Sequence, residues 1–135
     1  MTPSIKEASS LSSGENPDTP LRIVGLNVRS LNTLKQLQVR ELLAEDSNTA
    51  LVFLETWLSR PFNTKTEKFK AYHAGATQKK SSGITIVIPQ AFISDILFPE
   101  LTSPYTLLVR VRGAITDTVI LGVYLPRDAK ISANF

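Results

Sequence analysis

The feature that most constrains this fold is a strand–helix–strand pattern early in the chain. LRIVGLNV (21–28) and ALVFLE (50–55) are apolar runs with β-branched residues, which is typical of buried strands. Between them, 34–46 contains no Gly or Pro and repeats leucine and valine at helical spacing. Because a helical crossover joins parallel strands, we predict a parallel pair with the helix on one face.

The remainder of the chain is dominated by strand patterns. Residues 69–75 alternate between apolar and polar types, while 91–98 fits either a short helix or a strand. Apolar residues on both faces of 117–126 indicate a central strand. We predict that five strands form one sheet with the 34–46 helix on its outer face, and these strands are 22–28, 50–55, 83–88, 106–112 and 117–125.

Length and composition set limits on the class of protein. A chain of 135 residues suits one domain, and residues 1–20, rich in Ser, Pro, Thr and Glu, predict a disordered tail before a folded region at 21–135. The absence of cysteine excludes disulfides, cysteine-ligated zinc and a thiol nucleophile. No apolar run approaches the roughly 18 residues of a membrane helix, and no secretory signal is present. We therefore expect an intracellular protein, with the nucleus as one option.

Three of the predicted strands end on polar residues: Asn27, Glu55 and Tyr124. The carboxyl ends of parallel strands share one edge of a sheet, where ligands commonly bind, so Asn27 and Glu55 should lie together. A carboxylate beside an amide supplies the oxygen ligands that suit Mg²⁺. The residues alone leave plainer alternatives open: a solvent-facing Glu55, a turn residue at Asn27, and a core aromatic at Tyr124.

Four motifs occur in an order that resembles a known superfamily. They are LRIVGLNVRSL, LVFLETWL, SSGITIVI and VILGVYLP, and together they resemble the endonuclease/exonuclease/phosphatase superfamily. The resemblance is strongest to the apurinic-type endonuclease domain of non-LTR retrotransposons, and it spans roughly 21–127. It implies an α/β (α+β) layered sandwich, of which this chain would be the N-terminal half of a four-layer fold.

The resemblance also implies roles for the strand-end residues. Glu55 would be a ligand of a catalytic Mg²⁺ or Mn²⁺, Asn27 would position the site, and Tyr124 would contact the scissile phosphate. The reaction implied is phosphodiester hydrolysis, with the metal as Lewis acid and a histidine stabilising the developing charge. DNA would be the substrate of an intact relative.

The chain departs from that family in several ways. The Asp-x-Asn motif and the late Asp-His pair of the family are missing, and the one histidine, His73, lies in no family motif. Arg29 occupies a position that is acidic in some relatives. Half of the fold should also leave an inner sheet face bare, either Leu107, Val109 and Val111 or the matching face of 117–126, through which copies could self-associate.

A basic segment follows the second strand. It carries six cations against the single acidic residue Glu67, and a DNA duplex would favour such a segment through counterion release. The plain alternative is a solvated, charged loop. The six cations are Arg60, Lys65, Lys68, Lys70, Lys79 and Lys80.

We interpret the sequence as a fragment of a metal-dependent phosphodiesterase, of DNA endonuclease type and inactive alone. The alternative is a non-catalytic remnant that binds nucleic acid or protein.

Overall fold

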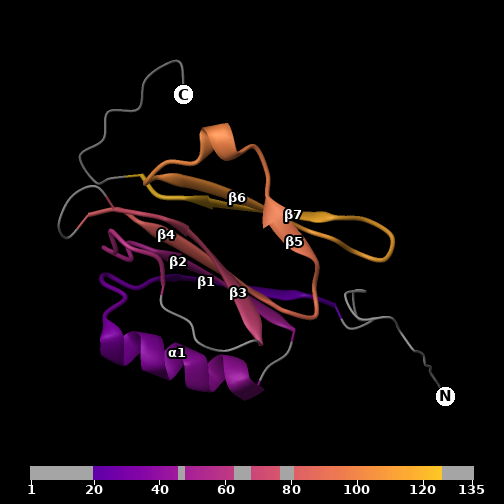
Figure 1. Cartoon of the computed structure of the whole chain (residues 1–135), viewed down its shortest axis with the longest axis horizontal. Coiled ribbons are helices and arrows are strands. Elements are labelled where there is room, and N and C mark those ends of the chain that lie inside the picture. The colour runs from indigo at the N-terminus through magenta and orange to yellow at the C-terminus, as the bar shows by residue number, and fades with distance from the viewer. Residues whose placement is uncertain (1–19, 46–47, 63–67, 77–80, 126–135) are drawn as a thin grey trace.

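The computed structural model of the chain describes residues 20–45, 48–62, 68–76 and 81–125. Within these residues the elements follow one another as β1 (Arg22–Asn27), α1 (Thr33–Glu45), β2 (Thr49–Leu54), β3 (Phe69–Ala74), β4 (Ile84–Pro89), β5 (Ser94–Ile96), the 3₁₀ helix η2 (Pro99–Leu101), β6 (Thr106–Val111) and β7 (Thr118–Val123) (Figure 1). The predicted tail lies outside this part of the chain, apart from Pro20. No helix in the described ranges is long and apolar enough to cross a membrane.

The strands form two sheets, so the prediction of a single sheet is wrong. One sheet has the order β1-β2-β4-β3 and the other has the order β5-β6-β7. β1 and β2 are parallel, as the strand–helix–strand pattern predicts, and every other pair is antiparallel. The alternation of 106–111 fits either sheet equally well, because a strand pattern shows that one face is buried but not which element covers it.

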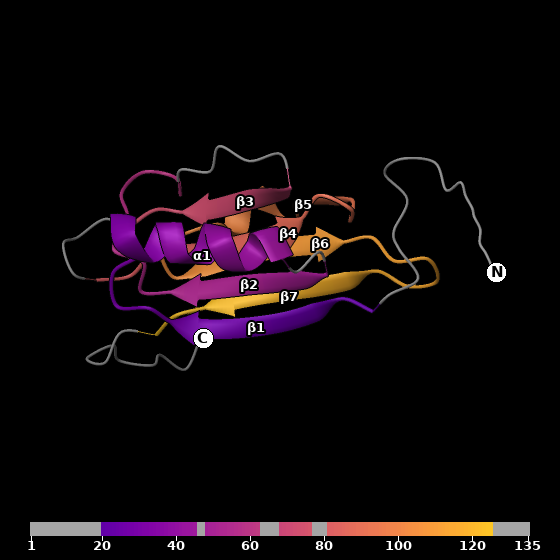
Figure 2. The ribbon, with the colours of Figure 1, turned by 90° about the horizontal axis from the view of Figure 1, so that it is seen from below.

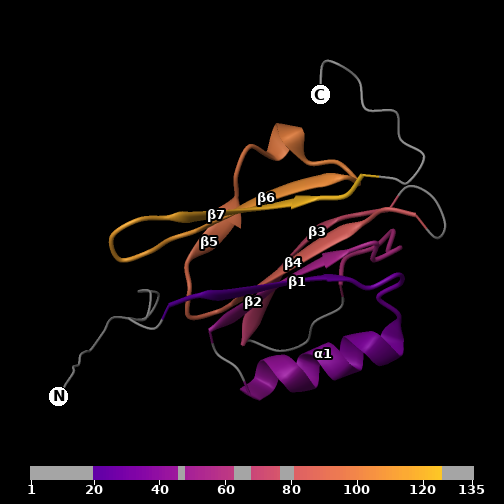
Figure 3. The ribbon, with the colours of Figure 1, turned by 180° about the vertical axis from the view of Figure 1, so that it is seen from behind.

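The two sheets lie face to face, and α1 covers the far side of the four-stranded sheet (Figures 1 and 3). Ile84, Ile86 and Ile88 of β4 share the core between the sheets with residues of β6 and β7. A second core lies beneath α1, where Leu43 contacts a cluster that includes Leu51 and Phe53 of β2. Alternate residues of β2 therefore enter different cores, which explains its continuous apolar sequence.

The expected bare inner face is not present. Leu107 and Val109 are fully buried and Val111 is 2% exposed, because the four-stranded sheet covers β6. Because this face is buried, copies of the chain cannot self-associate through it in the way predicted. The prediction of a central strand at 117–126 is also wrong: β7 is an edge strand, and Val119 and Leu121 on its outer face are 49% and 55% exposed.

Exposed apolar residues gather instead along one side of the molecule. All six residues of β1 are exposed, although its sequence RIVGLN reads as a buried strand. Helix α1 has no single apolar face, and Leu34, Leu37 and Leu42 are exposed on it. Figure 2 shows β1 and β7 on this same side, each at the edge of its own sheet.

Candidate active site

The carboxyl ends of β1 and β2 meet at one edge of the four-stranded sheet. Asn27 is in register with Leu54, and the Val28 amide donates to the Leu54 carbonyl at 2.9 Å. The next residue, Glu55, accepts a 2.8 Å hydrogen bond from the Ser30 amide at its carbonyl. Asn27 and Glu55 therefore lie on the same edge, as the sequence predicts.

Tyr124 reaches this edge from the other sheet. It follows β7 directly, and its hydroxyl donates a 2.7 Å hydrogen bond to Oε1 of Glu55. That bond is the main reason why the pKa of Tyr124 is raised above its ordinary value of 10.0, and burial adds to the rise. The structure thus brings the side chains of Glu55 and Tyr124 into contact, and the register with Leu54 places Asn27 on the same edge.

The backbone around Glu55 has an unusual conformation. Arg29, Ser30, Glu55 and Trp57 all have positive φ, with values of 45°, 94°, 57° and 58°. Residues other than glycine rarely adopt this region. Each such conformation costs about 1–3 kcal/mol and persists only where the surrounding structure enforces it. Strained residues of this kind concentrate at functional sites, and here two short segments in contact hold four of them.

Backbone hydrogen bonds join the LVFLETWL and SSGITIVI motifs beneath this edge. The Thr56 amide donates to the Gly83 carbonyl and the Trp57 amide donates to the Ser82 carbonyl, both at 3.1 Å. Gly83 has a φ of 92°, and a Cβ there would lie 2.4 Å from Oγ1 of Thr56. A glycine is therefore required at this position, because it leaves room for the buried Thr56 that follows Glu55.

Sequence reasoning missed two residues of the site. The ring of Tyr105 stacks on that of Tyr124 with centroids 6.4 Å apart, and the Tyr124 amide donates to the Tyr105 carbonyl. The signal for Tyr105 is antiparallel pairing of the predicted strands 106–112 and 117–125, because the observed register puts Thr106 opposite Val123 and hence Tyr105 beside Tyr124. Arg29 is the second: its Nε lies 4.0 Å from Oε2 of Glu55, and its side chain is 81% exposed.

His73 lies on β3 near the same end of the sheet. Its Nδ1 is 2.9 Å from Oγ1 of Thr85, and burial lowers the pKa of the imidazole below 6.5, partly opposed by the Leu58 carbonyl. The Thr85 contact and the register with β4 place His73 on the face of the sheet that α1 covers. Glu55 and Tyr124, by contrast, meet where the two sheets approach each other.

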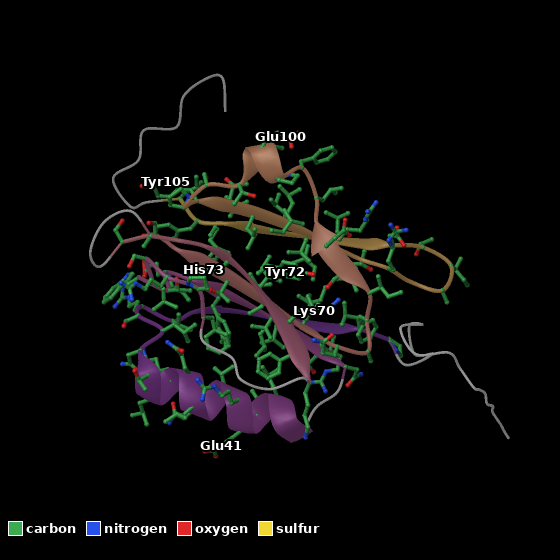
Figure 4. The ribbon with its side chains drawn as sticks, viewed as in Figure 1. Glu41, Lys70, Tyr72, His73, Glu100 and Tyr105 are labelled. Carbon is green, nitrogen blue, oxygen red and sulfur yellow. The ribbon has the colours of Figure 1, made fainter. Side chains whose placement is uncertain are left out.

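The described part of the basic segment lies mostly away from this edge. Lys68 precedes β3 and Lys70 lies near its start, whereas Ala74, at the other end of β3, is next to the Glu55 edge through Ile84 and Leu54. Figure 4 shows His73 and Tyr105 on the left of the molecule, and Lys70 to the right of both, near the middle. Arg60 and Lys68 are exposed and Lys70 is half-buried. Lys65, Lys79 and Lys80 lie outside the described residues, so DNA binding by this segment stays a prediction.

The donor set at this edge does not by itself fit a resident metal ion. Glu55 offers one carboxylate, with Oε1 bonded to Tyr124 and Oε2 facing Arg29. Among the described residues, no three His, Cys, Asp or Glu side chains gather closely enough to hold a metal. Mg²⁺ binds through one or two carboxylates and retains several waters, so these residues could hold it only weakly without further ligands.

The fold is a mixed α/β arrangement of two sheets and one α-helix within the described residues. No protein-family model matches the sequence, and no curated protein matches it either. Among solved structures, the chain is similar to the endonuclease domain of TRAS1, a telomere-specific non-LTR retrotransposon, with a TM-score of 0.58 at 14% sequence identity. The match covers 82% of this chain and 47% of that one, so this chain spans about half the length of its structural relative. The resemblance seen in the sequence motifs is thereby confirmed at the level of the fold.

Proposed function

We propose that residues 21–135 form the N-terminal half of a four-layer, metal-dependent phosphodiesterase domain of the DNA endonuclease type. The observation that carries this proposal is the 2.7 Å hydrogen bond between Tyr124 and Glu55, at the edge where β1 ends on Asn27. Three polar strand ends from two sheets converge there on strained backbone, which is the arrangement expected of a ligand-binding edge in an α/β fold.

The chemistry of each side chain suits a phosphodiester substrate. Glu55 is held by Tyr124 and is the carboxylate that would bind a divalent cation weakly at this edge; such a cation would supply Lewis-acid chemistry. Tyr124 carries a hydroxyl that keeps its proton at neutral pH, since its pKa is raised, and because that single proton is donated to Glu55, it could turn to a phosphate oxygen only if a cation took its place on the carboxylate. The exposed amide of Asn27 is free to orient the same group.

This chain alone should have almost no hydrolytic activity. Phosphodiester hydrolysis needs a base to activate water and a donor to the developing charge, but His73 lies on the other face of the sheet, and no described group of three His, Cys, Asp or Glu side chains includes Glu55. Absence of a general base typically costs ~10²–10⁴-fold in rate, and loss of an imidazole donor, which Arg29 or Tyr124 could replace only in part, costs up to a further ~10²–10³-fold. These losses together should bring hydrolysis close to background.

Nicking of supercoiled plasmid DNA tests the proposal. We expect the purified chain to give no nicking above background with Mg²⁺ or Mn²⁺, on plasmid with or without abasic sites. Glu55→Gln is the informative variant, and Glu100→Gln, an exposed glutamate on η2, is its matched control. Robust nicking that Glu55→Gln abolishes would confirm the site and overturn the inactivity, whereas nicking that survives Glu55→Gln would overturn the site itself.

A non-catalytic DNA-binding role is the second candidate. It is favoured by Arg29, which is 81% exposed beside the site and offers a guanidinium to a phosphate, and by the exposed Arg60. Such binding would be weak and would fall steeply with salt, because it rests on counterion release. Titration of a labelled duplex at two salt concentrations, with Arg29→Gln compared with wild type, measures it.

A further inference from the structure

β1 is the outermost strand on one side of the four-stranded sheet, and no described strand pairs with its side opposite β2. Backbone bonds to β2 use Arg22 at one end and Val28 at the other, since their amides donate to the Asn48 and Leu54 carbonyls. Backbone direction alternates along a strand, so Ile23, Gly25 and Asn27 turn their N–H and C=O groups away from β2, toward the open side. No described strand pairs with these groups, and an exposed apolar edge strand of this kind is a template for strand addition.

An apolar groove runs beside this edge, between β1 and α1. It consists of two adjoining hollows, about 140 and 310 Å³ in volume, which share Leu26 and Leu42. Leu26 and Leu42 are 46% and 57% exposed, and Val24 on the same face of β1 is 36% exposed. A strand added to β1 would therefore place every second side chain over apolar surface.

The sequence of β1 is complementary to itself in one antiparallel register. If Gly25 faces Gly25 of a second copy, Val24 lies opposite the second copy's Leu26, on the groove side of the sheet. Arg22 then lies opposite Val28, so that no like charges face each other. Nothing lies within 4 Å of the position a Cβ would take on Gly25, so a side chain introduced there would meet no described atom of its own copy.

Pairing of β1 with its copy alone would bury too little surface for a stable dimer. Other exposed surface on the same side of the molecule would enlarge the interface. A stable dimer buries roughly 800 Å² on each partner. The open edge of β7 lies on the same side as β1, and β7 carries the exposed Val119 and Leu121 (Figure 2). A two-fold axis perpendicular to the sheets would extend both sheets at once.

We propose that a second copy of this chain docks on the β1 edge, by antiparallel β1–β1 pairing centred on Gly25. The interface continues over the groove that Leu26 and Leu42 line, and over the edge of β7. This proposal does not depend on nuclease activity, and it differs from association through the inner sheet face, which is buried.

Light scattering coupled to gel filtration tests the oligomeric state. We expect a dimer of the wild-type chain at micromolar concentrations. Leu26→Lys should raise the dissociation constant by more than about tenfold, because lysine on an edge strand opposes pairing. Ile115→Lys is the matched control, since Ile115 is 96% exposed in the β6–β7 connection, and it should leave the dimer unchanged. A monomer at every concentration, or equal effects of the two lysines, would overturn the proposal.

Cysteine cross-linking tests the register without relying on a destabilising change. The chain has no cysteine, so a single one can be introduced cleanly. Residues in a hydrogen-bonded antiparallel pair have Cα atoms about 5.5 Å apart, which matches disulfide geometry. Gly25→Cys should therefore give a covalent dimer on mild oxidation, whereas Arg22→Cys, about 20 Å from its copy, should not. Cross-linking through position 22 but not 25 would contradict this register.

Discussion

The hydroxyl of Tyr124 donates a 2.7 Å hydrogen bond to the carboxylate of Glu55, across a sequence separation of 69 residues. This bond joins the two sheets at the edge where β1 and β2 end, and it fixes the one carboxylate of the candidate site. Because the residues come from different sheets, the site exists only when the sheets are stacked correctly. The following tests therefore address both the site and the packing that forms it.

The pKa of Tyr124 should report on the bond directly. The carboxylate of Glu55 raises this pKa by accepting a hydrogen bond from the hydroxyl, so Glu55→Gln should lower the pKa of Tyr124 toward 10.0. A group whose folded pKa is raised stabilises the fold below its unfolded pKa, and that contribution disappears as pH rises through the folded pKa. Ultraviolet titration of the three tyrosines, with Tyr124→Phe to assign the signal, measures the shift. An unchanged Tyr124 titration in Glu55→Gln would show that the bond is absent in solution.

Gly122 sets the distance between the sheets. A Cβ on Gly122 would lie 2.9 Å from Cγ2 of the buried Ile84, so Gly122→Ala should lower the free energy of unfolding by about 1–3 kcal/mol. Gly25→Ala is the control, because nothing lies within 4 Å of its Cβ position. Urea unfolding of both variants measures the difference. Equal stability of the two would mean that the sheets pack less closely than described.

Ser30 tests whether the site stores backbone strain. Its φ of 94° suits glycine, so Ser30→Gly should raise the free energy of unfolding by roughly 0.5–1 kcal/mol, after allowance for the greater freedom of the unfolded chain. Ser59, which is exposed and has no positive φ, provides the control, and Ser59→Gly should be neutral or slightly destabilising. If Ser30→Gly destabilises the protein more than Ser59→Gly does, the strained conformation is not the one in solution.

His73 should make the protein less stable in mild acid. Burial lowers its pKa in the folded state, so the unfolded chain binds more protons between the folded pKa and 6.5. Stability therefore falls as pH drops through that window, and is fully present above it. His73→Asn keeps a polar group near Thr85 and should weaken this pH dependence between pH 7.5 and 5.5. Identical pH profiles for the variant and the wild type would contradict the burial of His73.

The sequence predicts the individual elements better than their assembly. The patterns at 34–46 and 106–112 match α1 and β6 closely, because helical spacing and strict alternation are local signals. The division into two sheets is not a local property, since it depends on which apolar face meets which. β7 shows this most clearly, because its apolar residues on both faces resemble those of a central strand, yet it lies at an edge.

The candidate active site, too, could be predicted only in part from local sequence patterns. The strand-end positions of Asn27 and Glu55 follow from parallel pairing, which the helical crossover dictates. The contact between Glu55 and Tyr124 could only be expected from the family resemblance, because it crosses between sheets. Positive φ at Arg29 and Trp57 has no sequence signal at all, since neither residue type favours that conformation.

Mn²⁺-induced line broadening in the amide NMR spectrum tests the central claim most directly, because it locates a weak cation site without requiring activity. We expect selective broadening of residues 27–30 and 55–57, little effect at Lys68, which precedes the far end of β3, and loss of the effect in Glu55→Gln. Broadening that centres on other carboxylates, such as Asp95, or that persists in Glu55→Gln, would contradict a cation site at this edge.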